Sequence, residues 1–450
     1  MRYIYLLVFF FITQGIHSQA LKKKKKGSKS QTLVSSADSL SSSTVVSSET
    51  AWVKSDFYTS DSLRKMDSIW LSIMASSLPV QIELTEQELV SDSLSVEPTV
   101  LNTALLKERL ERINQSTPFD LSYNPVIENF IKKYLKHRSK YYPVIFSRAA
   151  YYFPIFESYL SEFDLPLEIK YLAIVESALK PTAKSRVGAT GLWQFMYQTG
   201  RQYNLNISSY VDERRDPIKS TIAACKYLRS LYKTFKDWDL ALAAYNSGPG
   251  NVTKAIRRSG GHRNYWNIRS YLPRETADYV PAFYATIYIY EYAKSHNIEP
   301  LNPMVYSFET DTVVPKKTIP FNTLVKELDI DPEVLTFLNP QYYLRIVPYV
   351  KDRSYPLRLP ISKAANFIEK EEELYQILAL ESEKREKPLP KYFEMNKRIR
   401  YQVKGGDSLS IIARNFGVKI SEIKRWNRLN STTIRIGQRL TIYPRRIRYS

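Results

Sequence analysis

The sequence is poor in several residues on which whole classes of protein depend. Cys225 is the only cysteine among 450 residues, which excludes a disulfide scaffold and any zinc site built from several thiolates. Four histidines leave little for a histidine-rich metal site. After the first 13 residues no apolar run approaches about 18 residues, so a polytopic membrane protein is excluded as well.

What the chain does contain is apolar and basic. Hydrophobic residues make up 44% and aromatic residues 13%, enough for real cores, and the length suggests two to four domains at about 150 residues each. The 65 Lys and Arg exceed the 45 Asp and Glu by 20, and residues 397–450 alone contribute a net charge of +12, from 14 basic and two acidic residues. Such a terminus could bind nucleic acid, but in an exported protein cell-wall polymers or lipid head groups are the better partners.

The N-terminus has the pattern of an export signal. Arg2 precedes an apolar stretch over 3–12, and the small Ser18 follows, so we predict a signal peptide over 1–18. The five lysines of 22–26 favour retention on the cytoplasmic side, which leaves an uncleaved membrane anchor open. A Lys- and Ser-rich stretch follows, with 13 Ser in 28–62, and we predict a disordered linker over 19–100.

The C-terminal third contains two segments with one pattern at a constant offset of 88. Leu324 and Leu328 correspond to Ile412 and Phe416, and Asn339 corresponds to Asn427. In each segment two short amphipathic helices precede the Asn, and a short β segment ending in Pro follows. The pattern predicts a small βααβ unit of about 45 residues. We place the two units at 305–362 and 398–446, with a helical linker over 363–397.

The second unit resembles a LysM domain, a family that binds glycans containing N-acetylglucosamine. The likeness lies in Tyr-Gln-Val-Lys-Gly-Gly-Asp-Ser-Leu-Ser at 401–410 and in Ile-Gly-Gln-Arg-Leu-Thr-Ile at 436–442. It implies a shallow glycan groove between two loops, formed by Gly406, Asp407, Ser408, Leu409, Ile434 and Ile436. The first unit has Thr-Ile-Pro-Phe-Asn at 318–322 in place of the Gly-Asp turn, so we interpret it as a degenerate, structural LysM-like unit.

Residues 101–300 are helical by pattern, and one carboxylate in them lies among apolar residues. We predict a helix that begins at Leu165-Pro166 and runs to Ser177, and it is apolar nearly all round. Ile169 and Leu172 flank Glu176 on this helix. A carboxylate that loses hydration in an apolar patch holds its proton more tightly, as a general acid must. A surface Glu near a helix end is the alternative from this segment alone.

Three further motifs follow in order: Gly-Leu-Trp-Gln at 191–194, Ala-Tyr-Asn-Ser-Gly at 244–248 and Glu-Thr-Ala-Asp-Tyr-Val-Pro at 275–281. Together with Glu176-Ser177 they resemble the soluble lytic transglycosylase family, and with the LysM unit its membrane-bound type D. The resemblance covers about 105–450. It implies a mainly α, lysozyme-like catalytic domain over 101–300, followed by small α+β LysM-type modules.

The resemblance also implies site residues and a reaction. Glu176 would be the single catalytic acid and base. Five residues would contact the substrate or Glu176: Ser177, Gln194, Tyr245, Asn246 and Tyr279. Trp193, Phe195 and Tyr265 are weaker candidates for stacking on sugar rings, with core packing as the alternative for each. Glu275 and Asp278 are expected to be structural.

The implied activity is cleavage of the β-1,4 bond between N-acetylmuramic acid and N-acetylglucosamine without water, which leaves 1,6-anhydro ends. Glycosidases ordinarily use two carboxylates, whereas the acids in these motifs besides Glu176 are only Glu275 and Asp278, which are expected to be structural. We expect no metal and no other cofactor, peptidoglycan glycan strands as the partner, and no nucleic acid. The expected location is the periplasm or cell envelope of a Gram-negative bacterium. A goose-type muramidase and a non-catalytic peptidoglycan-binding protein are the alternatives.

Overall fold

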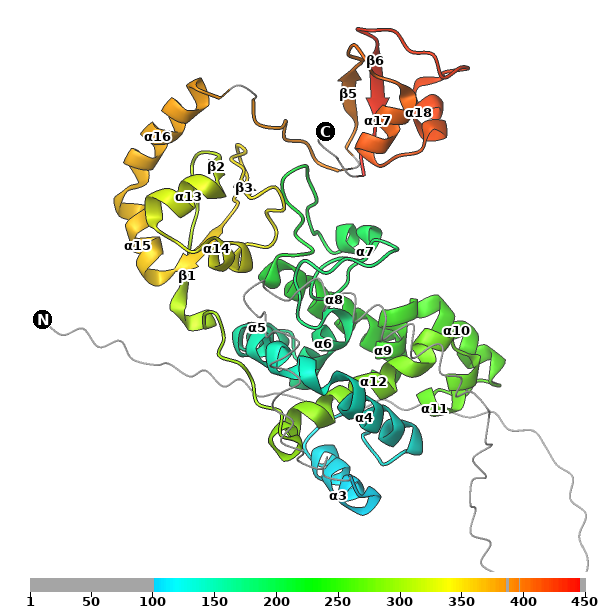
Figure 1. Ribbon diagram of the computed structural model, residues 1–450. Coiled ribbons are helices and arrows are strands. Elements are labelled where there is room, and N and C mark those ends of the chain that lie inside the picture. Colours follow the sequence, from blue (N-terminus) through cyan, green and yellow to red (C-terminus); the bar gives the residue numbers. More distant parts are fainter. Residues whose placement is uncertain (1–100, 386–387, 396, 446–450) are drawn as a thin grey trace, which may run out of the picture. The chain divides into compact units, whose positions relative to one another are not determined.

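A computed structural model describes residues 101–385, 388–395 and 397–445 (Figure 1). The predicted signal peptide and linker of 1–100 lie outside the described residues. Within these ranges no helix is both long enough and apolar enough to span a membrane.

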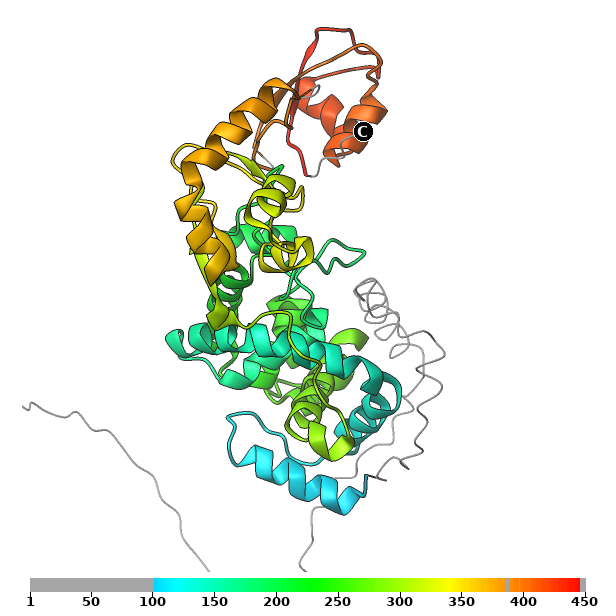
Figure 2. The same cartoon turned by 60° about the vertical axis from the view of Figure 1, so that its left-hand side comes forward.

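The N-terminal half of the described chain is helical and is built around α12 (Arg274–Glu291). Twelve of its residues are buried, and it packs against α4 (Pro125–Arg138), α9 (Trp238–Ser247) and α6 (Leu172–Ser177) (Figures 1 and 2). The other helices of this part are α3 (Thr103–Asn114), α5 (Tyr142–Glu162), α7 (Tyr197–Gln202), α8 (Pro217–Phe235), α10 (Pro249–Arg258) and α11 (Tyr265–Ile268). Helix packing around one buried helix agrees with the predicted mainly α domain.

Polar caps and prolines start the helices that frame the centre of this domain. The side chain of Asn124 accepts a hydrogen bond from the Val126 amide ahead of α4, and Asp216 accepts two such bonds at the start of α8. Each cap satisfies amide groups that have no partner within the helix and typically contributes about 1 kcal/mol. Proline stands at the first position of both helices, where its missing N–H costs nothing.

The predicted helix ending at Ser177 exists in a tighter and shorter form. A 3₁₀ turn, η2 (Leu167–Tyr171), leads into α6, so Pro166 precedes the first turn instead of lying in it. Ile169 and Leu172 are fully buried, as the apolar pattern predicts. Ala178 and Leu179 both have left-handed backbone angles, with φ of 50° and 56°, which ends the helix just after Glu176.

The C-terminal part contains the two predicted βααβ units. The first has β1 (Thr310–Val313), α13 (Phe321–Leu328), α14 (Pro332–Leu338) and β4 (Leu357–Pro360). The second has β5 (Ile399–Gln402), α17 (Leu409–Phe416), α18 (Ile420–Asn427) and β6 (Arg439–Ile442). The outer strands of each unit pair antiparallel, and α13 and α17 match at the offset of 88 at both ends. The first unit has one additional pair, β2 (Ile319–Pro320) with β3 (Ile346–Val347).

One asparagine makes the same hydrogen bonds in both units. Asn339 donates to the carbonyls of Leu335 and Arg358 and accepts from the Arg358 amide. Asn427 donates to the carbonyls of Ile423 and Thr441 and accepts from the Thr441 amide. Each side chain therefore fastens the second helix of its unit to the last strand. The repeat predicted from the sequence is confirmed, and so is the predicted fold class.

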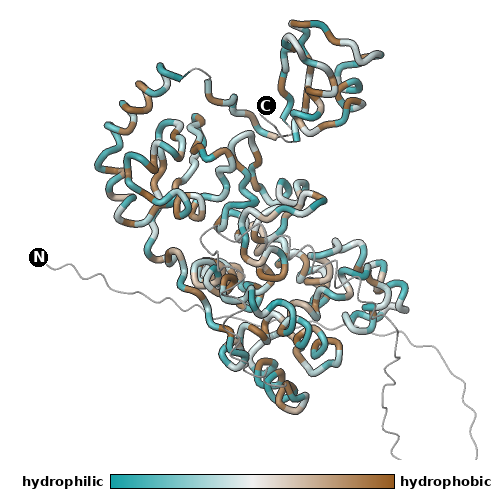
Figure 3. Tube along the Cα trace, viewed as in Figure 1, coloured by the Kyte–Doolittle hydropathy of each residue, from teal (hydrophilic) through white to brown (hydrophobic). Residues whose placement is uncertain are grey.

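Two helices follow the first unit, α15 (Ile361–Glu369) and α16 (Glu371–Glu383). Acidic residues at both ends of α16 flank an apolar stretch over 377–380 (Figure 3). The buried residues Leu374, Tyr375 and Leu378 of this helix join the core of the first unit, and the Tyr375 hydroxyl accepts a hydrogen bond from the Lys316 amide. Much of the segment predicted as a linker thus packs on the unit that precedes it.

Candidate active site

The centre of the site is a carboxylate in the last turn of a short helix. Glu176 is partly buried at the end of α6, and α12 packs against this helix. The hydroxyl of Tyr279, itself buried on α12, donates a hydrogen bond to Oε1 of Glu176. The sequence motif around Tyr279 therefore lies beside the motif around Glu176, although 103 positions separate the two residues.

The surroundings of Glu176 favour its protonated form. Burial raises the pKa of this carboxyl to about 7, the bond from Tyr279 lowers it in part, and the negative charge of Glu275 raises it further. Glu275 is exposed at the start of α12. A carboxyl with a pKa near neutrality can donate a proton and later accept one at physiological pH.

This environment predicts opposite pH shifts in two variants. Activity that needs protonated Glu176 is present below its pKa and is lost as pH rises through about 7. Glu275→Gln removes a charge that raises the pKa, so the alkaline limb of kcat/KM should move to lower pH. Tyr279→Phe removes a bond that lowers the pKa, so the limb should move to higher pH. Shifts in the same direction in pH–rate profiles of the two variants would contradict this assignment.

Tyr245 and Asn246 end α9 beside this centre. The Tyr245 hydroxyl donates to the carbonyl of Trp193 at 2.8 Å, which fastens α9 to the 191–194 motif. Burial and the nearby charge of Glu176 raise the pKa of Tyr245 well above its usual value, so it stays neutral. The side-chain oxygen of Asn246 accepts a bond from the Thr276 hydroxyl at 2.8 Å. That bond orients the amide so that its NH₂ group is the part available to a ligand.

The small-residue loop over 183–195 is folded on itself. The amide and carbonyl of Thr190 both pair with those of Phe195, and the Gly191 amide donates to the Ala183 carbonyl. Gln194 has a left-handed backbone angle, with φ of 45°, and its side-chain amide donates to the carbonyls of Gly191 and Ala183. A non-glycine residue in this conformation carries backbone strain, which the hydrogen bonds of its side chain offset.

Gly191 occupies a position that no other residue can fill. Its φ is +93°, and a Cβ built on it would lie 1.8 Å from the backbone oxygen of Arg214. The glycine therefore allows the loop to contact the segment before α8 at backbone distance.

Several residues predicted to touch the sugar are inside the protein. Ser177 is fully buried, and its hydroxyl lies 2.9 Å from the carbonyls of Ala173 and Leu192, so it joins α6 to the loop and has no surface open to a sugar. Trp193, Phe195 and Tyr265 are at most 2% exposed. The prediction that these rings stack on sugars is wrong, and core packing is what they do. Asp278 forms an ion pair with Arg269, the structural role expected of it.

The residues predicted to form a glycan groove in the second unit lie on two loops that approach each other. Asp407 accepts hydrogen bonds from the Tyr401 hydroxyl and the Lys404 amide, which fixes the turn at Gly406. Ser408 caps α17, and Leu409 is buried beneath. Ile436 is 77% exposed, and its Cδ1 would lie 4.0 Å from a Cβ at Gly405. Ile434 is partly buried in the core of this unit.

Across the described ranges, no group of three or more His, Cys, Asp or Glu side chains is arranged to hold a metal ion. The lone cysteine, Cys225, is buried on α8, and burial raises the pKa of its thiol to about 12.

Comparisons with known proteins match this arrangement in three places. A family model described as the transglycosylase SLT domain matches residues 155–268. A LysM domain model matches 401–442, and the LysM-like domain of the lytic transglycosylase MltD matches 309–376. The membrane-bound lytic murein transglycosylase D of Escherichia coli strain K12 is 32% identical over 331 residues, which cover 69% of this chain and 67% of that protein. This chain belongs to that family.

More distant relatives cover less. The soluble lytic murein transglycosylase of E. coli K12 is 28% identical over 181 residues, which cover 39% of this chain and 27% of that protein. The crystal structure of the 70 kDa soluble lytic transglycosylase from E. coli aligns with 30% identity over 31% of this chain and 24% of that one, at a TM-score of 0.27. The chain is a lytic transglycosylase with a peptidoglycan-binding LysM module. The predictions of an enzyme and of its class are confirmed.

Sequence reasoning did not single out Arg214, which is 6% exposed and donates to the carbonyls of Gly188 and Phe195 on either side of Gln194. Nothing in the local pattern marks its contact with the loop, because the two carbonyls that it holds lie 26 and 19 positions away in the sequence.

Proposed function

We propose that Glu176 is the only acid and base in non-hydrolytic cleavage of peptidoglycan strands. One observation carries this proposal: a carboxyl with a pKa of about 7, in a largely apolar setting, held by the hydroxyl of Tyr279. The hydrogen bond fixes the carboxyl in one orientation, and burial raises the fraction of molecules in which it is protonated near neutral pH.

The reaction proceeds in two proton transfers. Protonated Glu176 gives its proton to the oxygen that joins C1 of N-acetylmuramic acid to N-acetylglucosamine, and the C1–O bond breaks. The positive charge that develops at C1 is stabilised by the 2-acetamido group of the sugar. Glu176, now a carboxylate, takes the proton of the muramyl 6-hydroxyl, whose oxygen bonds to C1. The carboxyl is regenerated, no water is consumed, and the product ends in 1,6-anhydromuramic acid.

The neighbouring residues have roles that follow from their contacts. Asn246, oriented by Thr276, offers its NH₂ group to the acetamido carbonyl of the sugar. Gln194 offers its side-chain oxygen to a sugar hydroxyl, since its nitrogen is bonded within the loop. Tyr245 and Ser177 act through the loop, whose carbonyls at Trp193 and Leu192 they hold.

Product analysis tests this proposal. Muropeptides released from purified sacculi should be lighter by one water than hydrolysis products, and their anhydro ends should resist borohydride reduction. Reducible ends would mean that water attacks C1 and that the enzyme is a muramidase.

The LysM groove supplies retention on the wall. In the proposed groove Ile436 is the most exposed apolar side chain, and a glycan would cover it. Losing that contact costs on the order of 1 kcal/mol, so Ile436→Ser should weaken sacculus binding about fivefold and leave turnover of short soluble glycans unchanged. Ile368→Ser, at an apolar residue on α15 that is 66% exposed, is the matched control. Equal loss of binding in both variants would contradict the proposal that the groove binds the wall.

We further propose the organisation and location in the cell. The domains are a signal peptide (1–18), a linker (19–100), the catalytic domain (101–300), the LysM-like unit (305–362), a helical linker (363–397) and the LysM domain (398–446). The enzyme works in the cell envelope on glycan strands. The E. coli relative is named as membrane-bound, and here the N-terminal signal, left uncleaved, would supply a membrane anchor.

A further inference from the structure

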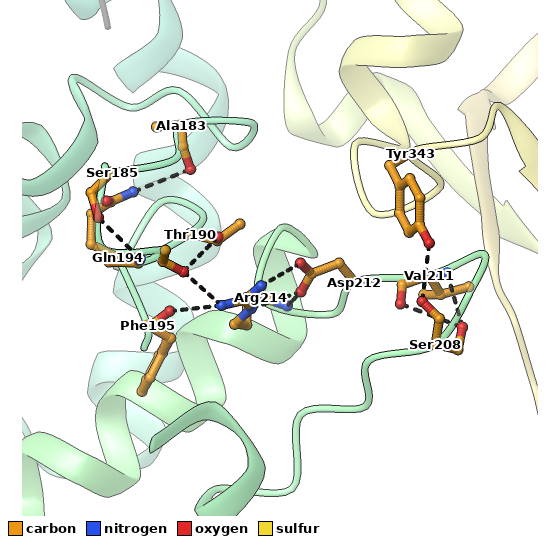
Figure 4. A network of polar contacts seen from close by, with 12 residues as sticks. Ala183, Ser185, Thr190, Gln194, Phe195, Ser208, Val211, Asp212, Arg214 and Tyr343 are labelled. Carbon is orange, nitrogen blue, oxygen red and sulfur yellow. Dashed lines mark hydrogen bonds and ion pairs between the residues drawn. The ribbon is translucent and has the colours of Figure 1, made fainter. Parts of the chain in front are cut away.

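A buried ion pair contacts the loop that contains Gln194. Nε and Nη2 of Arg214 donate to the two carboxylate oxygens of Asp212 at 2.9 and 2.7 Å, and both side chains are less than 10% exposed (Figure 4). The remaining nitrogen, Nη1, donates to the carbonyl of Gly188 at 3.0 Å and to that of Phe195 at 3.2 Å. The guanidinium therefore joins the two ends of the segment that contains Gln194.

Asp212 and Arg214 lie at the end of a turn over 207–214. The start of this turn is hydrogen-bonded to residues that lie far away in the sequence. The Ser209 amide donates to the Phe393 carbonyl, and the Met395 amide donates to the Ile207 carbonyl, at 2.9 and 2.8 Å. The Ser209 hydroxyl donates to the Lys391 carbonyl and accepts from the Phe393 amide. We call Lys391–Met395 the strap. It ends four residues before β5, the first strand of the LysM domain.

The LysM-like unit also holds this turn. The Tyr343 hydroxyl donates to the carbonyls of Ser208 and Ser209 (Figure 4), and the Asp212 amide donates to the Gln341 carbonyl at 3.0 Å. Glu394 of the strap forms ion pairs with Arg353 of the same unit and with Lys397. The turn over 207–214 is thus held by both C-terminal segments on one side, and it holds the substrate loop on the other.

We propose that Arg214 is a positioning residue for the Gly188–Phe195 loop, and that the strap and Tyr343 set where Arg214 lies. The inference rests on the proposed role of that loop in binding the glycan. The physical reason is rigidity. A bidentate pair fixes the guanidinium in direction as well as distance, and the turn between the strap and Asp212 is short and bonded internally from the Ser208 amide to the Val211 carbonyl. A displaced strap therefore moves the carbonyls that Arg214 holds.

The inference couples wall binding to catalysis. A LysM domain held by the wall can pull on the strap, because only residues 396–398 separate the strap from β5. The effect should fall on substrate affinity, since the loop contacts the sugar, and leave the proton transfers of Glu176 unchanged.

Two neighbouring tyrosines offer a matched test in the full-length protein. Tyr343→Phe removes the hydroxyl that donates to the carbonyls of Ser208 and Ser209, whereas Tyr342→Phe removes a bond to the Pro356 carbonyl within the LysM-like unit. With a short soluble glycan, Tyr343→Phe should raise KM about threefold to tenfold, the effect of one lost hydrogen bond, and change kcat less than about twofold. Tyr342→Phe should leave KM as in the parent. Equal KM values for both variants, at equal thermal stability, would overturn the inference.

A double-mutant comparison shows whether the effect passes through Arg214. Arg214→Gln should raise KM more than Tyr343→Phe, and the double variant should be no worse than Arg214→Gln alone, because both act on one connection. If the increase in KM of the double variant equals the product of the increases in the two single variants, the two residues act independently and the inference is wrong. If Arg214→Gln does not fold, Ser209→Ala, which removes two bonds to the strap, takes its place against Tyr343→Phe. The two proposals are tested separately. The activity of Glu176→Gln tests the catalytic role of Glu176, whereas these KM values test whether the strap and Tyr343 position Arg214.

Discussion

Glu176→Gln should fold and bind sacculi like the parent, and it should cleave them at least about 10²–10⁴-fold more slowly, the range for loss of general acid catalysis. The amide keeps the shape of the carboxyl, and its oxygen can still accept the bond from Tyr279. It cannot give up a proton to the bridging oxygen, and it cannot take one from the 6-hydroxyl. The loss should exceed that of an enzyme whose acid and base are separate groups. Release of anhydro ends, followed by mass analysis, measures it.

The same variant should differ from the parent in the pH dependence of stability. The folded-state pKa of Glu176, about 7, lies above its value of roughly 4.3 in the unfolded chain. The parent therefore loses free energy of unfolding as pH rises between these values, because the unfolded chain ionises a group that the fold keeps neutral. Glu176→Gln should escape this loss. Near-parental activity of the variant would place the acid elsewhere, and Glu275 is then the first residue to test.

Gly191→Ala should be far more damaging than Gly188→Ala, although both glycines have φ close to +90°. At Gly188 a new Cβ meets nothing within 4 Å, so the cost is backbone strain, about 1–2 kcal/mol in the free energy of unfolding. At Gly191 the Cβ would also meet the backbone of Arg214 at 1.8 Å, and the loop must move. A displacement of about 1 Å in a substrate loop can cost 10²-fold in rate, so we expect that loss of kcat/KM.

Thermal unfolding and kinetics on the two glycine variants check this. Gly188→Ala should keep most of its activity at a slightly lower Tm. If Gly191→Ala is as active as Gly188→Ala, the loop does not need its contact with the backbone before α8, and the role given to that contact is wrong.

The sequence predicted the elements whose signal is local. The short helices of the two βααβ units follow from residues a few positions apart, and the structure has them at the predicted offset of 88. The apolar setting of Glu176 was predicted from helical spacing alone, and burial of Ile169 and Leu172 confirms it. Its 3₁₀ start was missed because the same apolar spacing suits both helix types over a single turn.

What the sequence could not supply are contacts between distant segments. The bond from Tyr279 to Glu176 depends on how α12 packs against α6, and no periodicity encodes it. The burial of Ser177 and Trp193 depends on a loop that folds over them, so residues of a motif can support a site without touching its ligand. Arg214 was overlooked for the same reason.

Three tyrosine hydroxyls at the substrate loop and at the turn over 207–214 donate to acceptors of one kind. Tyr245, Tyr343 and Tyr210 donate to the main-chain carbonyls of Trp193, Ser209 and Pro390. A carbonyl oxygen is present whatever side chain its residue carries, proline included. The acceptor positions can therefore drift in sequence without losing the bond, while each tyrosine cannot be exchanged even for phenylalanine. Among diverging descendants of this chain, the tyrosines should be retained while the residues that supply the carbonyls change. Because the two positions do not change together, an analysis of covarying residue pairs would not detect these bonds.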